Sequence, residues 1–475
     1  MPSAAPAESN PYPSVPLVWT GLFSLYIVVW FLEFGKRVPA LGALRFEFLL
    51  GGVLVVAAIL SISSREESNT SRLTKFICVY FLFLLCDLAL SRYFWTSWDV
   101  FVERLLKFSC MALFTYAFVR SPRTLRIFVL VLMLVFFKLG EEAFIGRITG
   151  SMIWENQGIM RLNGQLGSRF GHPNSLSGLA IGALPFIYYL FPVLSRKWKM
   201  GLLVLLVFAV NIIIFTGSRT GYIATIALAG FLWMRSGKKG RFFAALVIVA
   251  VVGLPFLPEQ YEGRFKSAFV GQEIEGHSKA GRLEIASDAW HLFLENPQGL
   301  GIYSFRFARV ELLGKADYDT HNLYLQLLVD LGIVGTLVFG LLLTSLWSEL
   351  RSTDLTLARV EGELREAIAR MPARAEEARR HLADIRFMRA TASAFLGYLF
   401  ARLVMGVFGH DLYEIYWWLA SGASIAIVNM QPIAVTRTAE IIRRSTAPQP
   451  PIAAPPRVAL SAFVPLRAAS GGAPR

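Results

Sequence analysis

Stretches of about 17 to 25 mostly apolar residues recur along this chain and limit the folds open to it more than any other feature. A helix of about 20 apolar residues crosses the hydrocarbon core of a bilayer. Charged residues make up 17% of the chain, against about a quarter in soluble domains. The sequence therefore predicts an all-α polytopic membrane protein with about 12 transmembrane helices. The expected spans are residues 17–32, 42–62, 76–90, 99–119, 125–139, 176–194, 200–216, 221–234, 242–257, 323–346, 390–408 and 412–430.

Basic residues collect in alternate connections between these spans. Under the positive-inside rule such connections face the cytoplasm, which places both chain termini there. Topology thus accounts for much of the net charge of +14, and the spread of basic residues gives no support to nucleic-acid binding. The basic segments lie at 65–75, 120–126, 196–199, 235–241 and 347–389, and after residue 434.

Two long connections, 140–175 and 258–320, remain for the opposite, outer face of the membrane. Loops of this length are uncommon unless they are functional or disordered, and their aromatic content argues against disorder. We therefore expect the chemistry on this face. Within the second loop, residues 282–294 have a helical period, which predicts an amphipathic helix. Its apolar stripe would comprise Leu283, Ala286, Ala289, Trp290 and Phe293.

A short turn of sequence Thr-Gly-Ser-Arg-Thr-Gly at 216–221 puts Arg219 between two apolar spans on the outer face. An arginine so close to the hydrocarbon is costly unless it is paired, reaches the interface or lines a cavity. Flanking glycines let the backbone turn tightly and approach a ligand. The alternative is a plain hairpin turn with one snorkelling arginine.

A second arginine, Arg282, opens the amphipathic helix in the sequence Ala-Gly-Arg-Leu-Glu at 280–284. A cation at a helix N-terminus opposes the helix dipole, so an anion nearby would relieve it. That anion is either a ligand or a neighbouring carboxylate, such as Glu284 or Glu275.

His321 and Asn322 stand where the polar loop ends and the span 323–346 begins. A polar helix cap is one interpretation, and a proton acceptor near neutral pH is the other. Two guanidiniums can hold a diphosphate by forked hydrogen bonds and stabilise its charge as a glycosyl bond breaks. A histidine can meanwhile take the proton of the attacking hydroxyl. No zinc, EF-hand or phosphate-loop pattern occurs, so we expect neither a metal nor a cofactor.

In combination and order, these motifs resemble those of the superfamily of O-antigen ligases and O-antigen or exopolysaccharide polymerases of bacterial inner membranes. The resemblance covers about residues 165–345. It rests on Gly-His-Pro-Asn-Ser at 171–175, Gly-Ser-Arg-Thr-Gly at 217–221, Gly-Arg-Leu-Glu at 281–284, Asn-Pro-Gln-Gly-Leu-Gly at 296–301, and His-Asn at 321–322 followed by Gly332 and Gly335.

The resemblance implies metal-independent, inverting transfer of a glycan from undecaprenyl diphosphate to an acceptor hydroxyl on the periplasmic face. By motif, Arg219 and Arg282 would hold the pyrophosphate and His321 would be the base. Arg169 and His172 would form a secondary wall of the same cavity, although a helix cap alone also explains their motif. The residues expected to contact substrate are Arg169, His172, Asn174 and Asn322.

The expected organisation follows from the spans and the loops. The segments are a disordered cytoplasmic N-terminus (1–16), N-terminal transmembrane helices (17–139), a periplasmic loop (140–175), central transmembrane helices (176–257), a large, partly helical periplasmic catalytic loop (258–322), a transmembrane helix (323–346), a charged helical cytoplasmic excursion (347–389), C-terminal transmembrane helices (390–430) and a cytoplasmic tail rich in proline and alanine (431–475).

Three functions remain open. A ligase transfers the glycan to the lipid A core, and a polymerase transfers it to another lipid-linked repeat. The spacing from His321 to Gly335 favours the ligase by a small margin. A transporter or flippase of the lipid-linked glycan is the alternative from another class. The sequence lacks the paired Gly- or Pro-broken helices that transporters often carry in two halves.

Overall fold

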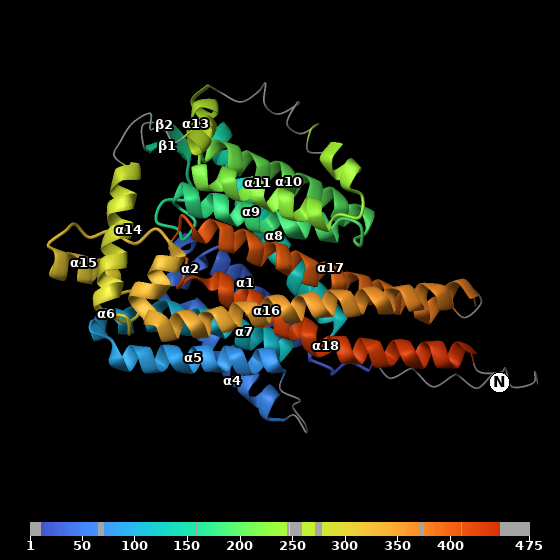
Figure 1. Ribbon diagram of the computed structural model, residues 1–475. Helices are drawn as coiled ribbons and strands as arrows, with labels where there is room; N and C mark the ends of the chain where they lie inside the picture. Colours follow the sequence, from blue (N-terminus) through green and yellow to red (C-terminus); the bar gives the residue numbers. More distant parts are fainter. Residues whose placement is uncertain are drawn as a thin grey trace, which may run out of the picture.

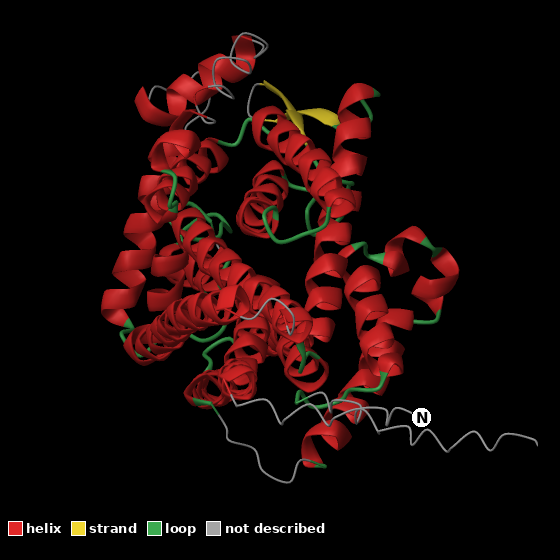
Figure 2. Cartoon of the chain, turned by 90° about the vertical axis from the view of Figure 1, so that its right-hand side faces the viewer, coloured by secondary structure: helices red, strands yellow, loops and turns green. Residues whose placement is uncertain are grey.

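The computed structural model describes residues 11–64, 71–156, 159–244, 247, 259–270, 278–370, 375–409 and 411–446. These residues are predominantly helical, and most of the long helices lie side by side in one bundle (Figure 1). In the part of the chain described, the strands β1 (Ile153–Asn156) and β2 (Ile159–Leu162) form an antiparallel hairpin in which Trp154 pairs with Arg161. This hairpin, yellow in Figure 2, was not predicted.

The helices of the first third begin near the expected spans. In chain order they are α1 (Leu17–Phe31), α2 (Phe34–Arg37), α3 (Pro39–Ala43), α4 (Phe46–Ser63), α5 (Arg72–Leu90), α6 (Phe94–Val100), the π-helical segment η1 (Phe101–Leu106), α7 (Lys107–Phe118) and α8 (Pro122–Ile148).

Four of the remaining described helices, which begin at Pro173, Arg219, Ser278 and Leu323, carry the sequence motifs at or near their starts. The remaining helices are α9 (Pro173–Leu190), α10 (Arg196–Phe215), α11 (Arg219–Arg235), α13 (Glu259–Val270), α14 (Ser278–Glu295), α15 (Phe305–Leu313), α16 (Leu323–Arg370), α17 (Ala375–Gly406) and α18 (Ile415–Thr446).

The two ends of the bundle differ (Figure 1). The short elements β1, β2, α13, α14 and α15 gather at one end, which we call the motif end. At the other, the hairpin end, α16 and α17 extend together beyond most of the bundle. Pro372, expected to interrupt this hairpin, lies outside the described residues.

Five of the described helices are long and apolar enough to cross a membrane: α4, α5, α10, α16 and α18. The expected count of about 12 is therefore not confirmed, and most of the expected span 242–257 lies outside the described residues. Composition alone misses enclosed helices, because a helix surrounded by protein tolerates polar residues. In α17, for example, every residue from Thr391 to Leu399 is buried.

The segment after α14 is attached to the bundle at a break in α16. Gly332 has a positive φ of 65°, and the segment after α14 crosses this break. Backbone hydrogen bonds join Leu300 N to Val329 O (3.0 Å) and Gly301 N to Asp330 O (2.8 Å). A Cβ on Gly299 or Gly332 would lie 2.6 Å or less from the facing backbone. The two glycines are therefore required by a close crossing of two backbones.

The predicted amphipathic helix is present as α14, and its buried face overlaps the predicted stripe only in part, at Ala289 and Phe293. Ile285, Ala289 and Leu292 pack in a cluster with Val329 of α16. Leu283 is 65% exposed, and the same stripe also leaves Trp290 half-exposed. The stripe was only partly right because the partner surface on α16, which decides the buried face, comes from a distant part of the sequence.

Candidate active site at the motif end

The turn that holds Arg219 is an N-terminal helix cap. Gly217 has a positive φ of 56°, which a glycine adopts without strain. The Oγ of Ser218 accepts a hydrogen bond from Gly221 N at 3.1 Å and so caps α11. Arg219 is the first residue of α11 and is half-buried. The local sequence therefore fixes the backbone from which this guanidinium extends.

The Gly-His-Pro-Asn motif caps α9 in the same manner. The Nδ1 of His172 accepts a hydrogen bond from Asn174 N at 3.2 Å, and Pro173 occupies the first helical position. The His172 ring is thus oriented by its own helix, and Asn174 lies in the first turn.

Arg161 of β2 joins these two helix starts and was not singled out from the sequence. It is 1% exposed. Its Nε donates to the carbonyl oxygen of Thr216 at 2.6 Å, and its guanidinium donates to Oδ1 of Asn174 at 3.2 Å. The Oγ of Ser218 donates to the same Asn174 oxygen at 3.0 Å. The turn before Arg219 and the helix start at His172 therefore form one hydrogen-bonded unit, called the Arg161 cluster below.

Tyr261 attaches the start of the second long loop to this cluster. Its hydroxyl donates to the carbonyl oxygen of Met160 at 2.8 Å, and its ring packs edge-on against Phe215, with 5.2 Å between centroids. Tyr261 lies in α13, which Figure 1 places beside β1 and β2. The two long loops predicted from the sequence, 140–175 and 258–320, thus meet next to the start of α11.

Arg282 lies in the first turn and a half of α14 and is half-buried. Glu284, one of its possible partners, lies 3.0 Å from Nζ of Lys315 and 3.5 Å from the guanidinium of Arg309. Asp288, one turn further along α14, binds the same two cations. Hydrogen bonds to Asp288 and Glu284 raise the pKa of Lys315. These pairs hold α14 against the chain that leads to His321.

His321 has a left-handed backbone, with φ of 49°, and its side chain is half-buried. A non-glycine residue in this region is uncommon and marks a constrained position. The next residue, Asn322, caps α16, because its Oδ1 accepts from Tyr324 N (2.9 Å) and Leu325 N (3.0 Å). Its Nδ2 donates to the carbonyl oxygen of Val407 at 3.0 Å. Asn322 therefore ties the position of His321 to the connection between α17 and α18.

The two aspartates before His321 already have hydrogen-bond partners. Arg306 binds Asp317 with two hydrogen bonds of 2.6 Å, which lower the pKa of this carboxyl group. The hydroxyl of Tyr303 donates to Asp319 at 3.3 Å. The negative charge of Asp317 is thus largely offset before it can act on the imidazole.

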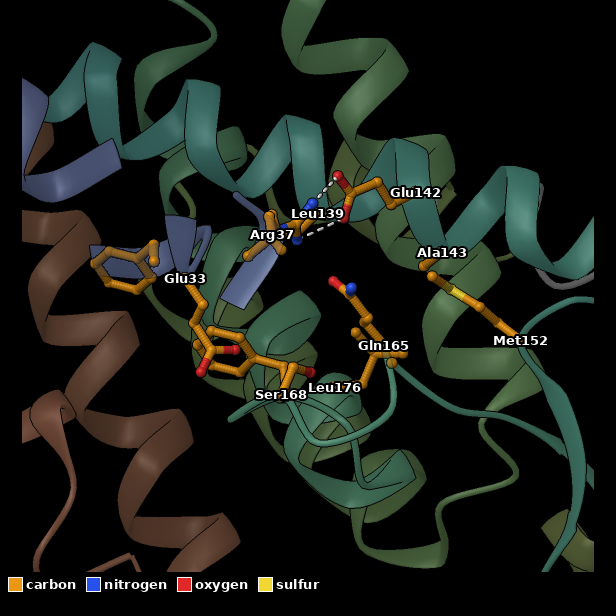
Figure 3. Close-up of a pocket in the computed structure, with 12 residues that line it drawn as sticks. Glu33, Arg37, Leu139, Glu142, Ala143, Met152, Gln165, Ser168 and Leu176 are labelled. Atoms are coloured by element: carbon orange, nitrogen blue, oxygen red, sulfur yellow. Dashed lines mark hydrogen bonds and ion pairs between the residues drawn. The ribbon is translucent and has the colours of Figure 1, made fainter. Parts of the chain in front are cut away.

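Arg169 takes part in a different set of contacts. Its guanidinium lies over the ring of Trp30, 4.0 Å from the centroid, and 3.6 Å from Glu47. Its backbone N–H donates to Glu33 at 3.1 Å. A small cavity beside Glu33 is lined by Ser168 and by the forked Arg37–Glu142 ion pair (Figure 3). The loop before α9 therefore has the Arg161 cluster on one side and Arg169 on the other.

Sequence positions expected to share a site are thus grouped in three sets. His172, Asn174 and the backbone of Arg219 belong to the Arg161 cluster. Arg282 and His321 lie on the segments that the Glu284–Lys315 pair joins, and Arg169 faces α1 and α4. Among the residues described, no three His, Cys, Asp or Glu side chains gather as metal ligands.

Comparison with protein families finds one match. The family described as O-antigen ligase matches residues 202–340, a segment that includes Arg219, Arg282 and His321. No curated protein matches the chain. The family match confirms the resemblance to the O-antigen ligase superfamily over residues 202–340, and this match and the apolar helices together indicate a multi-pass bacterial membrane protein.

Proposed function

We propose that this protein is a metal-independent, inverting glycosyltransferase that moves a glycan from undecaprenyl diphosphate to an acceptor hydroxyl on the periplasmic face of the bacterial inner membrane. We further propose that it is of the ligase type, with the lipid A core as acceptor. One observation carries this proposal: the segment matched to the O-antigen ligase family holds Arg219, Arg282 and His321 together.

In the proposed reaction, the guanidiniums of Arg219 and Arg282 bind the diphosphate by forked hydrogen bonds. His321 removes the proton from the acceptor hydroxyl as its oxygen forms a bond to the anomeric carbon. The bond from that carbon to the diphosphate oxygen breaks, and the electron pair leaves with the diphosphate. The arginines stabilise the charge that develops there. His172, Asn174 and Asn322 are proposed to contact substrate at the edge of the same site.

Three structural features support these roles. Arg219 extends from a capped helix start that the buried Arg161 holds in place. His321 follows Asp317, whose carboxylate is engaged by Arg306. The caps at Ser218 and Asn322 fix the backbones that carry two of the three groups, and such preorganisation is what transition-state stabilisation requires.

The test uses the full chain in detergent with an undecaprenyl-diphosphate-linked glycan and either lipid A core or a second lipid-linked repeat. Mass spectrometry measures released undecaprenyl diphosphate and the glycosylated acceptor, with and without EDTA. A glycan on lipid A core, insensitive to EDTA, is the expected product. A glycan added only to the second repeat would assign the protein as a polymerase. An intact donor under both conditions would contradict the proposed chemistry and favour a transporter.

The base role of His321 has its own test. His321→Gln keeps a polar side chain of similar length but cannot take up the proton. We expect this variant to bind the donor as the unmodified protein does and to transfer it very slowly at every pH. A variant that retains close to full transfer at pH 8 would exclude His321 as the base and leave it a positioning residue.

A further inference from the structure

A second and much larger cavity lies apart from the Arg161 cluster. It has a volume of about 1230 Å³ and is bounded mainly by α4, α5 and α7, with contributions from α1 and α18. This exceeds the range of about 300 to 1,000 Å³ that is typical of small-molecule sites. Its walls are largely apolar and include Phe48, Val55, Phe81, Leu82 and Leu113.

The cavity is long as well as large. Its lining follows α4 from Arg45 to Ile62. At about 1.5 Å per residue this distance is about 25 Å, close to the thickness of a bilayer's hydrocarbon core. Dividing the 1230 Å³ by this length gives a mean cross-section of about 50 Å². That is wider than one extended hydrocarbon chain needs, so the shape fits several chains lying side by side.

Only one end of the cavity is strongly charged. Arg45, Glu47, Glu103, Lys107 and Arg169 line it there. Arg169 contacts Glu47, and Lys107 pairs with Glu103. Among the described residues, no carboxylate pairs with Arg45, which is exposed and has a strained φ of 48°. One uncompensated guanidinium therefore marks the polar end of an apolar cavity.

We propose that this cavity binds an anionic lipid with several acyl chains, whose phosphate meets Arg45 and whose chains lie along α4 and α5. A guanidinium is well suited to a phosphate because it offers forked hydrogen bonds and a permanent charge. The lipid is either a membrane phospholipid or a lipid A-type acceptor, which share this chemistry. The site is distinct from the proposed donor site, because Arg219, Arg282 and His321 are all absent from the cavity lining.

Gly52 offers a direct way to fill the cavity. A Cβ at Gly52 would meet no atom within 4 Å, and the residue lines the cavity wall on α4. Gly52→Phe should therefore occupy the space with little disturbance of the fold. Gly21 of α1 is the matched control, since it is also helical and equally open, but it does not line the cavity.

The experiment places the full chain in phosphatidylcholine nanodiscs with one of two photoreactive probes. These are phosphatidylglycerol and lipid A, each with a diazirine on an acyl chain, and peptide mass spectrometry maps the labelled residues. We expect labelling on the cavity-facing residues of α4 and α5. It should fall roughly tenfold in Arg45→Gln, through loss of a charged hydrogen bond, be abolished in Gly52→Phe, and stay unchanged in Gly21→Phe.

The outcomes separate the sources of the lipid. Equal labelling by both probes supports a general anionic-lipid site, and labelling by lipid A alone supports an acceptor site. Labelling that Gly52→Phe leaves unchanged, or that unlabelled undecaprenyl phosphate displaces, would overturn the proposal. Because the readout is binding and not glycan transfer, it remains valid even if the proposed catalytic activity is not found.

Discussion

Arg389 and Arg235 at the hairpin end differ from the buried Arg161 at the motif end in the groups that they contact. The two arginines at the hairpin end contact carboxylates. Arg389 lies 3.1 Å from Asp354 and 2.9 Å from Glu361, and Arg235 lies 2.6 Å from Asp354. At the motif end, two contacts of the buried Arg161 are with neutral oxygens, the Thr216 carbonyl and the Asn174 amide.

The two kinds of acceptor have different effects on the charge and the orientation of a guanidinium. A carboxylate offsets the charge of a guanidinium and fastens two helices together. A carbonyl or amide oxygen fixes the orientation of a guanidinium but leaves the formal charge in place. At the hairpin end, the ion pairs of Asp354 and Glu361 thus join helices, whereas at the motif end the contacts of Arg161 with Thr216 and Asn174 fix the turn before Arg219.

The largest effect is expected from the arginines proposed to bind the diphosphate. Arg219→Ala and Arg282→Ala should each slow glycan transfer on the order of 100-fold or more, because a transition-state contact is lost. Lysine should rescue poorly, since it lacks the planar fork. Transfer is measured in detergent with saturating donor. Arg92→Ala, which removes a more exposed arginine paired with Glu311, should keep its rate. Transfer by both variants at the parental rate would remove these arginines from the mechanism.

Removal of Arg161 should have the next largest effect. Arg161→Met keeps the side-chain bulk but leaves the Thr216 carbonyl and the Asn174 amide without this donor. We expect transfer to fall at least tenfold because the turn before Arg219 is no longer fixed, at a cost of about 2 kcal/mol. Arg147→Met is the matched control, since Arg147 also lies near the end of α10, 4.2 Å from the ring centroid of Phe215. Equal losses of transfer in both variants would show that transfer needs positive charge in this region and not Arg161 in particular.

At the hairpin end the expected effect is on stability alone. Arg389→Met should lower the free energy of unfolding by about 2 kcal/mol, because two buried carboxylates lose a hydrogen-bond donor. The rate of transfer per folded molecule should not change. Thermal unfolding in detergent and the transfer assay at low temperature measure the two quantities. A variant that loses transfer but not stability would contradict the comparison between the two ends.

Helix starts were the most predictable features of the chain because their signals are local. The Gly-His-Pro-Asn and His-Asn motifs predicted helix caps, and His172 and Asn322 do cap α9 and α16. Each cap depends on atoms within three residues of the capping side chain, so a short stretch of sequence contains the whole interaction.

Features that depend on distant partners could not be predicted in this way. Arg161 is important because it contacts Asn174 and Thr216, which are 13 and 55 residues away. An arginine in a short strand gives no local sign of these contacts. The buried face of α14 was predicted only in part for the same reason, since Val329 of α16 packs against it. The expected span at 390–408 in α17 stays a prediction, because neighbouring helices and not lipid set the composition of an enclosed helix.

The smallest expected effect concerns pH at the hairpin end. His381 of α17 is buried, and its Nε2 lies 3.2 Å from the carbonyl oxygen of Ala434 and 2.9 Å from the hydroxyl of Thr438. A carbonyl oxygen can only accept, so Nε2 carries a proton and donates it to the Ala434 carbonyl. Burial lowers the pKa of His381 from 6.5 to about 4. The unfolded chain therefore takes up a proton at a higher pH than the folded chain does.

Because the pKa of His381 is lower in the folded chain than in the unfolded chain, the stability that its neutral ring contributes is fully present above about pH 6.5. This contribution is lost as the pH falls towards 4. Between pH 7.5 and 5.5 we expect a loss of about 1 kcal/mol. His381→Gln keeps an N–H donor and cannot titrate, so it should remove this part of the pH dependence. His291→Gln, at an exposed histidine of α14, should leave it unchanged. Thermal unfolding in detergent across this range measures the loss, and an identical pH dependence in His381→Gln would show that the acid sensitivity arises elsewhere.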